Sequence, residues 1–301
     1  MESNVKQNRR KHKWLSPLML ILCTVLVIYT ISLIVPITWG FFTSLKGKYE
    51  MRTNMFGLPK EWKWINYSEA FKAYKVLRRA PGGGWETVLL DKMMIYSVLY
   101  AVGCAAIQAI VTCIVAYVTS KFSHFFFAKM IYSTVLIVMM LPIVGSLPAE
   151  IALARTLGLY DSILGMWVLK FNFLGMYYLV FYAMFKGIPK DFSEAAYIDG
   201  ANEWMVMLKI ILPMARNTLS IVILLNFIGY WNDYQTPMLY MPSYPTMAYG
   251  LYNYSNTTDQ NFVNVPMQLT GCMLLMLPVL VIFMIFRNKL IGNISMGGLK
   301  E

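Results

Sequence analysis

The sequence contains little charge, few histidines and no paired cysteines. Only 14% of its 301 residues are charged and 58% are hydrophobic, whereas an average soluble protein is about 25% charged. The two histidines are too few for a histidine-based centre, and the four cysteines show no Cys-x-x-Cys spacing. This composition excludes an ordinary soluble enzyme, and it argues against a zinc site and a disulfide framework.

A phosphate-binding loop is also absent from the sequence. No Gly-x-x-x-x-Gly-Lys-Ser/Thr pattern occurs, and the glycines at 82–84 are not followed by the lysine that such a loop requires. We therefore expect a chain that hydrolyses no ATP, carries no cofactor and has neither catalytic residues nor metal ligands. An integral membrane enzyme, which needs clustered His, Asp or Glu at one membrane face, is a poor alternative.

Long apolar blocks make up most of the chain. Four blocks without any charge lie at 14–45, 93–120, 130–149 and 260–286. Two further blocks contain one charge each, Lys170 in 162–185 and Asp233 in 217–241. Each block holds the ~20 residues that cross a bilayer. The pattern predicts an all-α integral membrane protein with six transmembrane helices, of which the first is an uncleaved signal anchor.

The basic residues indicate an orientation with both termini in the cytosol. With this orientation the inner segments hold fourteen Lys and Arg, and the outer loops after the third and fifth spans hold only Arg155. The first outer loop, residues 46–92, is an exception, with ten basic and five acidic residues. We expect a surface loop with aromatic anchors there. Residues 1–14 are predicted to be a cytosolic tail, and residues 15–301 a single membrane domain.

A polar segment, residues 187–213, separates the fourth and fifth spans on the cytosolic side. Pro189 suits a first helical turn, Asp199-Gly200 indicates a stop, and Asn202 can cap a second helix that Pro213 limits. One apolar face of this second helix is formed by Trp204, Leu208 and Ile211. We predict a helix, a sharp turn and a helix. Periodicity alone favours a protein-binding unit and an amphipathic connector on the membrane surface equally.

The residues of this segment resemble the EAA loop of binding-protein-dependent ABC transporter permeases. Glu194-Ala195-Ala196 is followed by Gly200 and, after nine intervening residues, by Ile210-x-Leu212-Pro213. The resemblance covers nearly the whole chain and is greatest to the maltose-type, carbohydrate-uptake branch. Its further motifs are Trp231-Asn232-Asp233-Tyr234 with Pro237, Leu58-Pro59 leading to Asn66-Tyr67, and the tail Gly297-Gly298-Leu299-Lys300.

The resemblance implies a role for this chain and a set of partners. In the family the EAA loop is a coupling helix that seats in an ATPase subunit. Coupling contacts are thus carried over to Glu194, Ala195, Ala196 and Gly200, with Ile210, Leu212 and Pro213 supporting the loop. The implied partners are two ABC ATPase subunits that bind ATP and Mg, a second permease subunit, and an extracellular or periplasmic solute-binding protein. The chain would then be the permease subunit of an importer in the bacterial cytoplasmic membrane, moving an oligosaccharide by alternating access.

Alternatives remain for the cargo and for the polar residues within the spans. A peptide or a polyamine could replace the sugar, and a passive channel would not explain the cytosolic helix-turn-helix. Asp233 either lies near the outer interface or lines a sugar-binding cavity with its polar and aromatic neighbours Asn226, Tyr230, Trp231 and Asn232. Lys170 either snorkels or marks a break in the fourth span. Residues 242–266 are either a solvated turn region or a loop that reaches into the binding protein.

Overall fold

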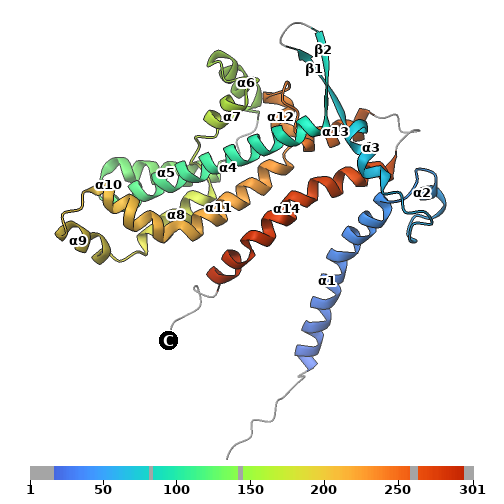
Figure 1. Ribbon diagram of the computed structural model, residues 1–301. Helices are drawn as coiled ribbons and strands as arrows, with labels where there is room; N and C mark the ends of the chain where they lie inside the picture. Colours follow the sequence, from blue (N-terminus) through green and yellow to red (C-terminus); the bar gives the residue numbers. More distant parts are fainter. Residues whose placement is uncertain (1–16, 81–83, 142–144, 258–263, 295–301) are drawn as a thin grey trace, which may run out of the picture.

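The computed structural model describes residues 17–80, 84–141, 145–257 and 264–294, so the predicted cytosolic tail and the Gly297–Lys300 motif lie outside the described residues. The described chain is mostly helical (Figure 1). Four of its helices are long and apolar enough to cross a membrane: α1 (Pro17–Ser44), α4 (Leu90–Lys121), the continuous helix over 203–232, and α14 (Val265–Ile294). The first, second, fifth and sixth predicted spans therefore correspond to long apolar helices, and the third and fourth are interrupted.

The third and fourth predicted spans are each divided into two helices. The third block contains α5 (Phe126–Met140) and the start of α6 (Leu147–Thr156), where Pro148 occupies the first turn. The fourth block contains α7 (Ile163–Leu169) and α8 (Met176–Lys186). Lys170 caps the end of α7, and the Asn172 side chain accepts a hydrogen bond from the Leu174 N–H at 2.8 Å. Lys170 therefore marks a break, as one of the two interpretations predicted.

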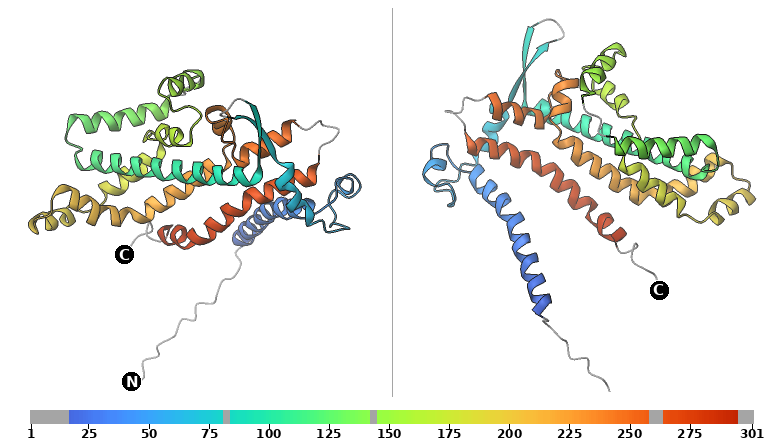
Figure 2. Two further views of the ribbon diagram at one scale, coloured as in Figure 1. Left: turned by 45° about the horizontal axis from the view of Figure 1, so that its top comes forward. Right: turned by 180° about the vertical axis from the view of Figure 1, so that it is seen from behind.

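Helix α4 is central to the packing. It lies against α11 (Leu212–Asn232), α8, α7 and α5 (Figures 1 and 2). Its buried side is rich in small residues, namely Ala101, Cys104, Ala105, Ala109, Cys113 and Ala116. Small side chains let helix backbones approach closely in a membrane protein. The two buried cysteines of α4 are free thiols, in agreement with a packing role.

The segment at 46–92, predicted to be the first outer loop, contains regular structure that the all-α prediction missed. After α2 (Glu50–Thr53) and α3 (Ile65–Ala73), strands β1 (Lys75–Ala80) and β2 (Gly84–Leu89) form an antiparallel hairpin with Val76 opposite Val88. Val76 and Val88 are buried, whereas the following pair, Leu77 and Thr87, is exposed. This alternation is the pattern of a strand with one face packed. The segment is thus an ordered unit with a protruding hairpin.

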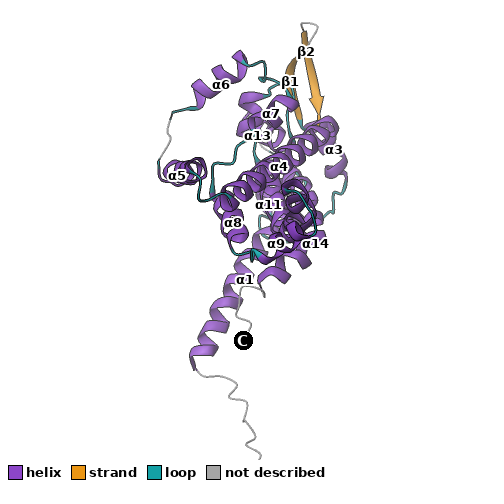
Figure 3. Cartoon of the chain, turned by 90° about the vertical axis from the view of Figure 1, so that its left-hand side faces the viewer, coloured by secondary structure: helices purple, strands orange, loops and turns teal. Residues whose placement is uncertain are grey.

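The two ends of the long helices carry different elements. The hairpin and α13 (Met247–Thr257) lie at one end, and α9 (Asp191–Ile198) lies at the other (Figures 1 and 2). Helix α12 (Gln235–Tyr240) ends just before residue 242. The region 242–266, for which a turn region was one of the two interpretations, contains α13, a helix of about three turns. Viewed along the bundle, α4, α11 and α14 lie together while α1 extends away from them (Figure 3). Helix α1 contacts α14 and buries only Gly40, Thr43 and Ser44.

Candidate functional site

The predicted helix-turn-helix is present and its turn has defined hydrogen bonds. Helix α9 ends at Ile198, and Gly200 adopts a left-handed conformation with φ +80°. The Ala201 N–H donates to the Ala196 carbonyl at 2.9 Å, and the Gly200 N–H donates to the Tyr197 carbonyl at 3.0 Å. These two bonds make a Schellman motif, which satisfies the last carbonyls of the helix. The Asp199-Gly200 stop signal is therefore confirmed in its geometry.

The second helix begins as predicted and continues further than predicted. The Asn202 side chain caps α10 (Glu203–Val206) by accepting the Met205 N–H at 2.9 Å. A π-helical turn, η1 (Met207–Ile211), follows, in which the Leu212 N–H bonds to the Met207 carbonyl. Pro213 then stands in the first turn of α11. Because proline has no N–H and its ring clashes with the carbonyl four residues earlier, the widened turn accommodates it without a break. The prediction that Pro213 limits this helix was wrong.

The side chains of α10 and the π-turn divide into a buried and an exposed set. Val206, Met207 and Ile211 face the core, whereas Trp204 and Leu208 are 69% and 56% exposed. The predicted apolar face of Trp204, Leu208 and Ile211 assumed a regular 3.6-residue period; Trp204 and Leu208 are both exposed, whereas Ile211, the last residue of the π-turn, is buried. An exposed tryptophan and an exposed leucine thus stand on the surface beside the turn.

The residues assigned to coupling divide into an exposed and a buried set. Glu194, Ala195, Gly200 and Pro213 are exposed, and Ile210 and Leu212 are partly buried. Ala196 is buried in a cluster with Tyr117, Phe185, Val206 and Ile211. A cavity of ≈ 490 Å³ lies beneath α9, between it and the ends of α4 and α8. Glu194 and Ala195 are therefore exposed, Glu194 also lines this cavity, and Ala196 packs α9 against the core.

The polar residues at the far end of α11 do not share one cavity. Tyr230 donates to Gln108 Oε1 at 2.6 Å and lies edge-on to Tyr100. Tyr100 donates to Asp233 Oδ2 at 3.2 Å, and the other oxygen of Asp233 accepts the Thr236 N–H at 3.0 Å. Asp233 is the C-terminal cap of α11, not a residue within the span. Asp233 and Tyr230 thus belong to one cluster, which also includes Tyr100 and Gln108.

The other three residues assigned to a substrate pathway point elsewhere. Trp231 is buried, and its Nε1–H donates to the Leu275 carbonyl of α14 at 2.8 Å. Asn232 is exposed and donates back to the Ile228 carbonyl. Asn226 is buried, and its amide nitrogen has no hydrogen-bond partner in the described chain. These side chains are therefore not positioned as a joint sugar site in this conformation.

Sequence reasoning did not connect Lys170 with this cluster. Its ammonium group lies 5.3 Å from the centre of the Tyr230 ring, a cation–π distance. The break between α7 and α8 brings Lys170 to the partner ring, although 60 residues separate the two positions. The signal in the sequence is the charge itself, since an ionisable group within an apolar block indicates a functional or structural polar site.

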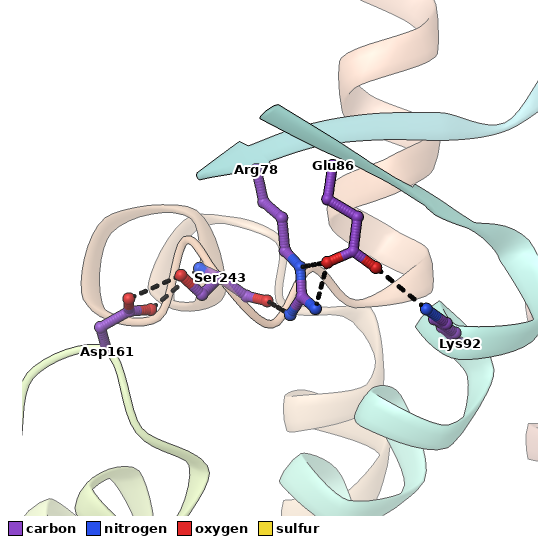
Figure 4. A network of polar contacts seen from close by, with 5 residues as sticks. All are labelled: Arg78, Glu86, Lys92, Asp161 and Ser243. Atoms are coloured by element: carbon purple, nitrogen blue, oxygen red, sulfur yellow. Dashed lines mark hydrogen bonds and ion pairs between the residues drawn. The ribbon is translucent and has the colours of Figure 1, made fainter. Parts of the chain in front are cut away.

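A polar network at the hairpin end joins three distant segments (Figure 4). Arg78 of β1 binds Glu86 of β2 at 2.8 Å and donates to the Ser243 carbonyl at 2.8 Å. Asp161, at φ +56°, accepts the Ser243 N–H and hydroxyl at 2.9 and 2.7 Å. Hydrogen bonds from Arg78 and Lys92 lower the pKa of the Glu86 carboxyl. The network ties the hairpin to the segment that leads into α13.

Residues 108–293 match the family described as binding-protein-dependent transport system inner membrane component. Among its relatives, the chain is 24% identical to the diacetylchitobiose uptake system permease protein NgcG of Streptomyces coelicolor, over 90% of this chain and 86% of the relative. It is 25% identical to the galactooligosaccharides transport system permease protein GanQ of Bacillus subtilis, over 100% of both.

The fold is also similar to that of a chain in the crystal structure of a bacterial ABC transporter involved in the import of the acidic polysaccharide alginate. The TM-score is 0.72 at 19% identity, over 91% of this chain and 98% of that chain. The likeness at this identity concerns the fold.

Proposed function

Because the chain belongs to the family of binding-protein-dependent transport system inner membrane components, we propose that it is the permease subunit of an ABC importer for a carbohydrate. The observation that carries this proposal is the family match over 108–293, which contains the complete helix-turn-helix. Relatives of this chain carry names of diacetylchitobiose and galactooligosaccharide transport systems. An oligosaccharide is therefore the cargo that we propose, in preference to a peptide or a polyamine.

The helix-turn-helix is the proposed contact with the ATPase subunits. Its exposed coupling residues Glu194 and Ala195 are accompanied by exposed apolar side chains, Phe192 at 48%, Ile198 at 87% and Trp204 at 69%. Large exposed apolar side chains beside the small, exposed Ala195 favour burial against another protein. ATP binding and hydrolysis in the partners would bias two conformations of the membrane domain through this contact.

The membrane arrangement that we propose has six crossings and cytosolic termini. The fourteen Lys and Arg of the inner segments support this orientation. The α5–α6 and α7–α8 pairs would supply the third and fourth crossings, because irregular backbone is tolerated at membrane depth where protein buries it. We propose a second permease subunit as the neighbour of α1, whose apolar surface is largely exposed in the isolated chain.

The proposed substrate pathway is narrower than the set of five residues drawn from the sequence. Tyr230 and Asp233 remain candidates, because their phenol and carboxylate groups form one cluster with Tyr100 and Gln108. Aromatic faces and hydrogen-bonding groups together suit a sugar. Asn226 remains a candidate through its unpaired buried amide, whereas Trp231 and Asn232 would have to reorient.

Transport by a reconstituted complex tests the proposal. The chain is assembled in proteoliposomes with its partner permease, two ATPase subunits and the binding protein. Labelled diacetylchitobiose and galactooligosaccharides are then supplied with ATP. We expect ATP-dependent accumulation of one of these sugars and none of a matched peptide or polyamine. Uptake of the peptide or the polyamine instead would overturn the carbohydrate assignment.

A further inference from the structure

A polar latch fastens the helix-turn-helix to α4. It consists of Lys121, Tyr197 and Glu203. Lys121 is the last residue of α4, whereas Tyr197 lies in α9 and Glu203 begins α10, on opposite sides of the turn. The Lys121 ammonium group donates to the Tyr197 hydroxyl and to the Glu203 carboxylate. The Tyr197 hydroxyl donates to the same carboxylate oxygen of Glu203 at 2.9 Å. The three side chains thus close a cyclic arrangement between three helices.

Aromatic rings surround the same ammonium group. Lys121 Nζ lies 5.2 Å from the ring centre of Tyr197, 5.8 Å from that of Tyr117 and 5.7 Å from that of Phe122. These are cation–π distances. The Lys121 side chain is 21% exposed, so it is largely withdrawn from water. Because its charge is both paired and held over aromatic faces, Lys121 is a fixed point of attachment.

Helix α9 has few other attachments to the bundle. Its one buried residue is Ala196. The cavity of ≈ 490 Å³ beneath it is lined by Lys121 and Tyr197 together with Phe185 and Ile188 of the α8 end. Helix α9 therefore does not lie on a continuous apolar floor. The latch spans the side of this cavity and links α9 to the end of α4.

The position of the latch relative to the turn determines what it constrains. The Schellman bonds join α9 only to the turn itself and make no contact with α4, and Gly200 between the two helices is exposed. Tyr197 and Glu203 flank Gly200 and bind one ammonium group, so tilting of α9 breaks contacts with both α10 and α4. Helix α4 packs in turn against α11, α8, α7 and α5. A displacement of α9 therefore also displaces α4, the helix at the centre of the bundle.

We infer that Lys121, Tyr197 and Glu203 are positioning residues that make the helix-turn-helix and α4 move together. They thereby set how much substrate is imported for each ATP that the partner subunits hydrolyse. This inference rests on the proposed function. The apolar contact of Ala196 and the covalent continuity of α10 with α11 form a parallel route, so loss of the latch weakens coupling without abolishing it.

The ratio of sugar imported to ATP hydrolysed, measured in the reconstituted complex, tests the latch. The variants are K121M, Y197F and E203Q, and K129M is the matched control because Lys129 is an exposed lysine of α5. Coupling free energies between sites are typically equivalent to factors of about 5 to 150. We expect K121M and E203Q to lower the ratio about fivefold, Y197F to lower it less, and K129M to leave it unchanged. K121R, which keeps the charge, should retain most of the wild-type ratio.

A double variant distinguishes a single unit from separate contributions. K121M/E203Q should be no worse than the poorer single variant, because either change alone opens the latch. Unchanged ratios in all three single variants, or strictly additive losses in the double variant, would overturn the inference. If K121M does not assemble, Y197F and E203Q decide the question, since Glu203 is 57% exposed and Y197F removes one hydroxyl. Absence of uptake by the wild-type complex would count against the proposed function instead.

Discussion

The backbone conformation at position 200, and not the space for a side chain, explains why this residue is a glycine. Its φ of +80° lies in the left-handed region, and a Cβ added there would meet no heavy atom within 4 Å. A side chain would therefore fit sterically. The cost of a substitution arises from the backbone, since left-handed conformations of L-residues other than Asn and Asp cost roughly 1–2 kcal/mol.

Comparison of G200V with G200N tests this explanation. Valine is β-branched and disfavours the left-handed region, so we expect G200V to distort the turn and to lower uptake roughly tenfold, the equivalent of about 1.4 kcal/mol. Asparagine tolerates this region and should retain most of the uptake. Both variants are compared at equal membrane abundance. Equal uptake by G200V, G200N and the wild type would show that the turn conformation has no role in coupling.

At the level of elements, the sequence predicts those that depend on local chemistry. The Asp199-Gly200 stop, the Asn202 cap and the long apolar helices are specified by residues within a few positions of one another, and the structure contains them. The sequence pattern did not predict the π-turn before Pro213, because apolar positions were assigned with the fixed 3.6-residue repeat of an α-helix and a π-turn departs from that repeat. The hairpin was missed because strands of six residues give a weak signal beside strong helical ones.

The candidate site was predictable only in part for a related reason. The coupling motif is contiguous in sequence, so its residues could be identified together. The polar cluster joins Tyr230 with Gln108, 122 positions away, and Asp233 with Tyr100, 133 positions away. Composition and spacing do not encode such pairings. The sequence therefore identified the polar residues of α11 and could not determine which of them meet.

The hairpin should lose order in acid because of its ion pairs. The pKa of Glu86 is lowered in the folded chain by Arg78 and Lys92, so the carboxylate stabilises the hairpin at pH values above its unfolded pKa of about 4.3. This contribution is lost as the pH falls through the lowered, folded pKa. We expect exchange of the hydrogen-bonded amides of β2 (Gly84–Leu89), corrected for intrinsic rates, to accelerate below about pH 4.

E86Q provides the matched comparison for the acid effect. The variant has no carboxylate to titrate at this position, so its hairpin should already exchange faster near neutral pH and should change less on acidification. Identical pH profiles for E86Q and the wild type would show that another group controls the hairpin.

In the whole molecule, α4 connects two polar networks that lie at its opposite ends. One of its ends meets the latch at Lys121, and the other meets the hairpin network through Lys92 and Glu86. The proposed ATPase contact and the hairpin end thus share one helix of 32 residues. Because the sequence shows no phosphate-binding loop pattern, we expect the energy for transport to come from separate ATPase subunits.

Purification of the chain alone tests this division of labour. We expect no ATP hydrolysis above the detergent or liposome background, and we expect hydrolysis to appear when the ATPase subunits are added. A preparation with the ATPase subunits but without this chain serves as the control for their basal rate. Turnover by the isolated chain would contradict the assignment of hydrolysis to separate subunits.

The exposed helix α1 has a consequence for biogenesis. Its buried residues are Gly40, Thr43 and Ser44 at its C-terminal end, and its most apolar 18-residue window is entirely unburied. It is the first of the four long helices to be synthesised, and its insertion needs no contact with later ones. We therefore expect α1 to enter the lipid before the later helices are made, without waiting for them as packing partners.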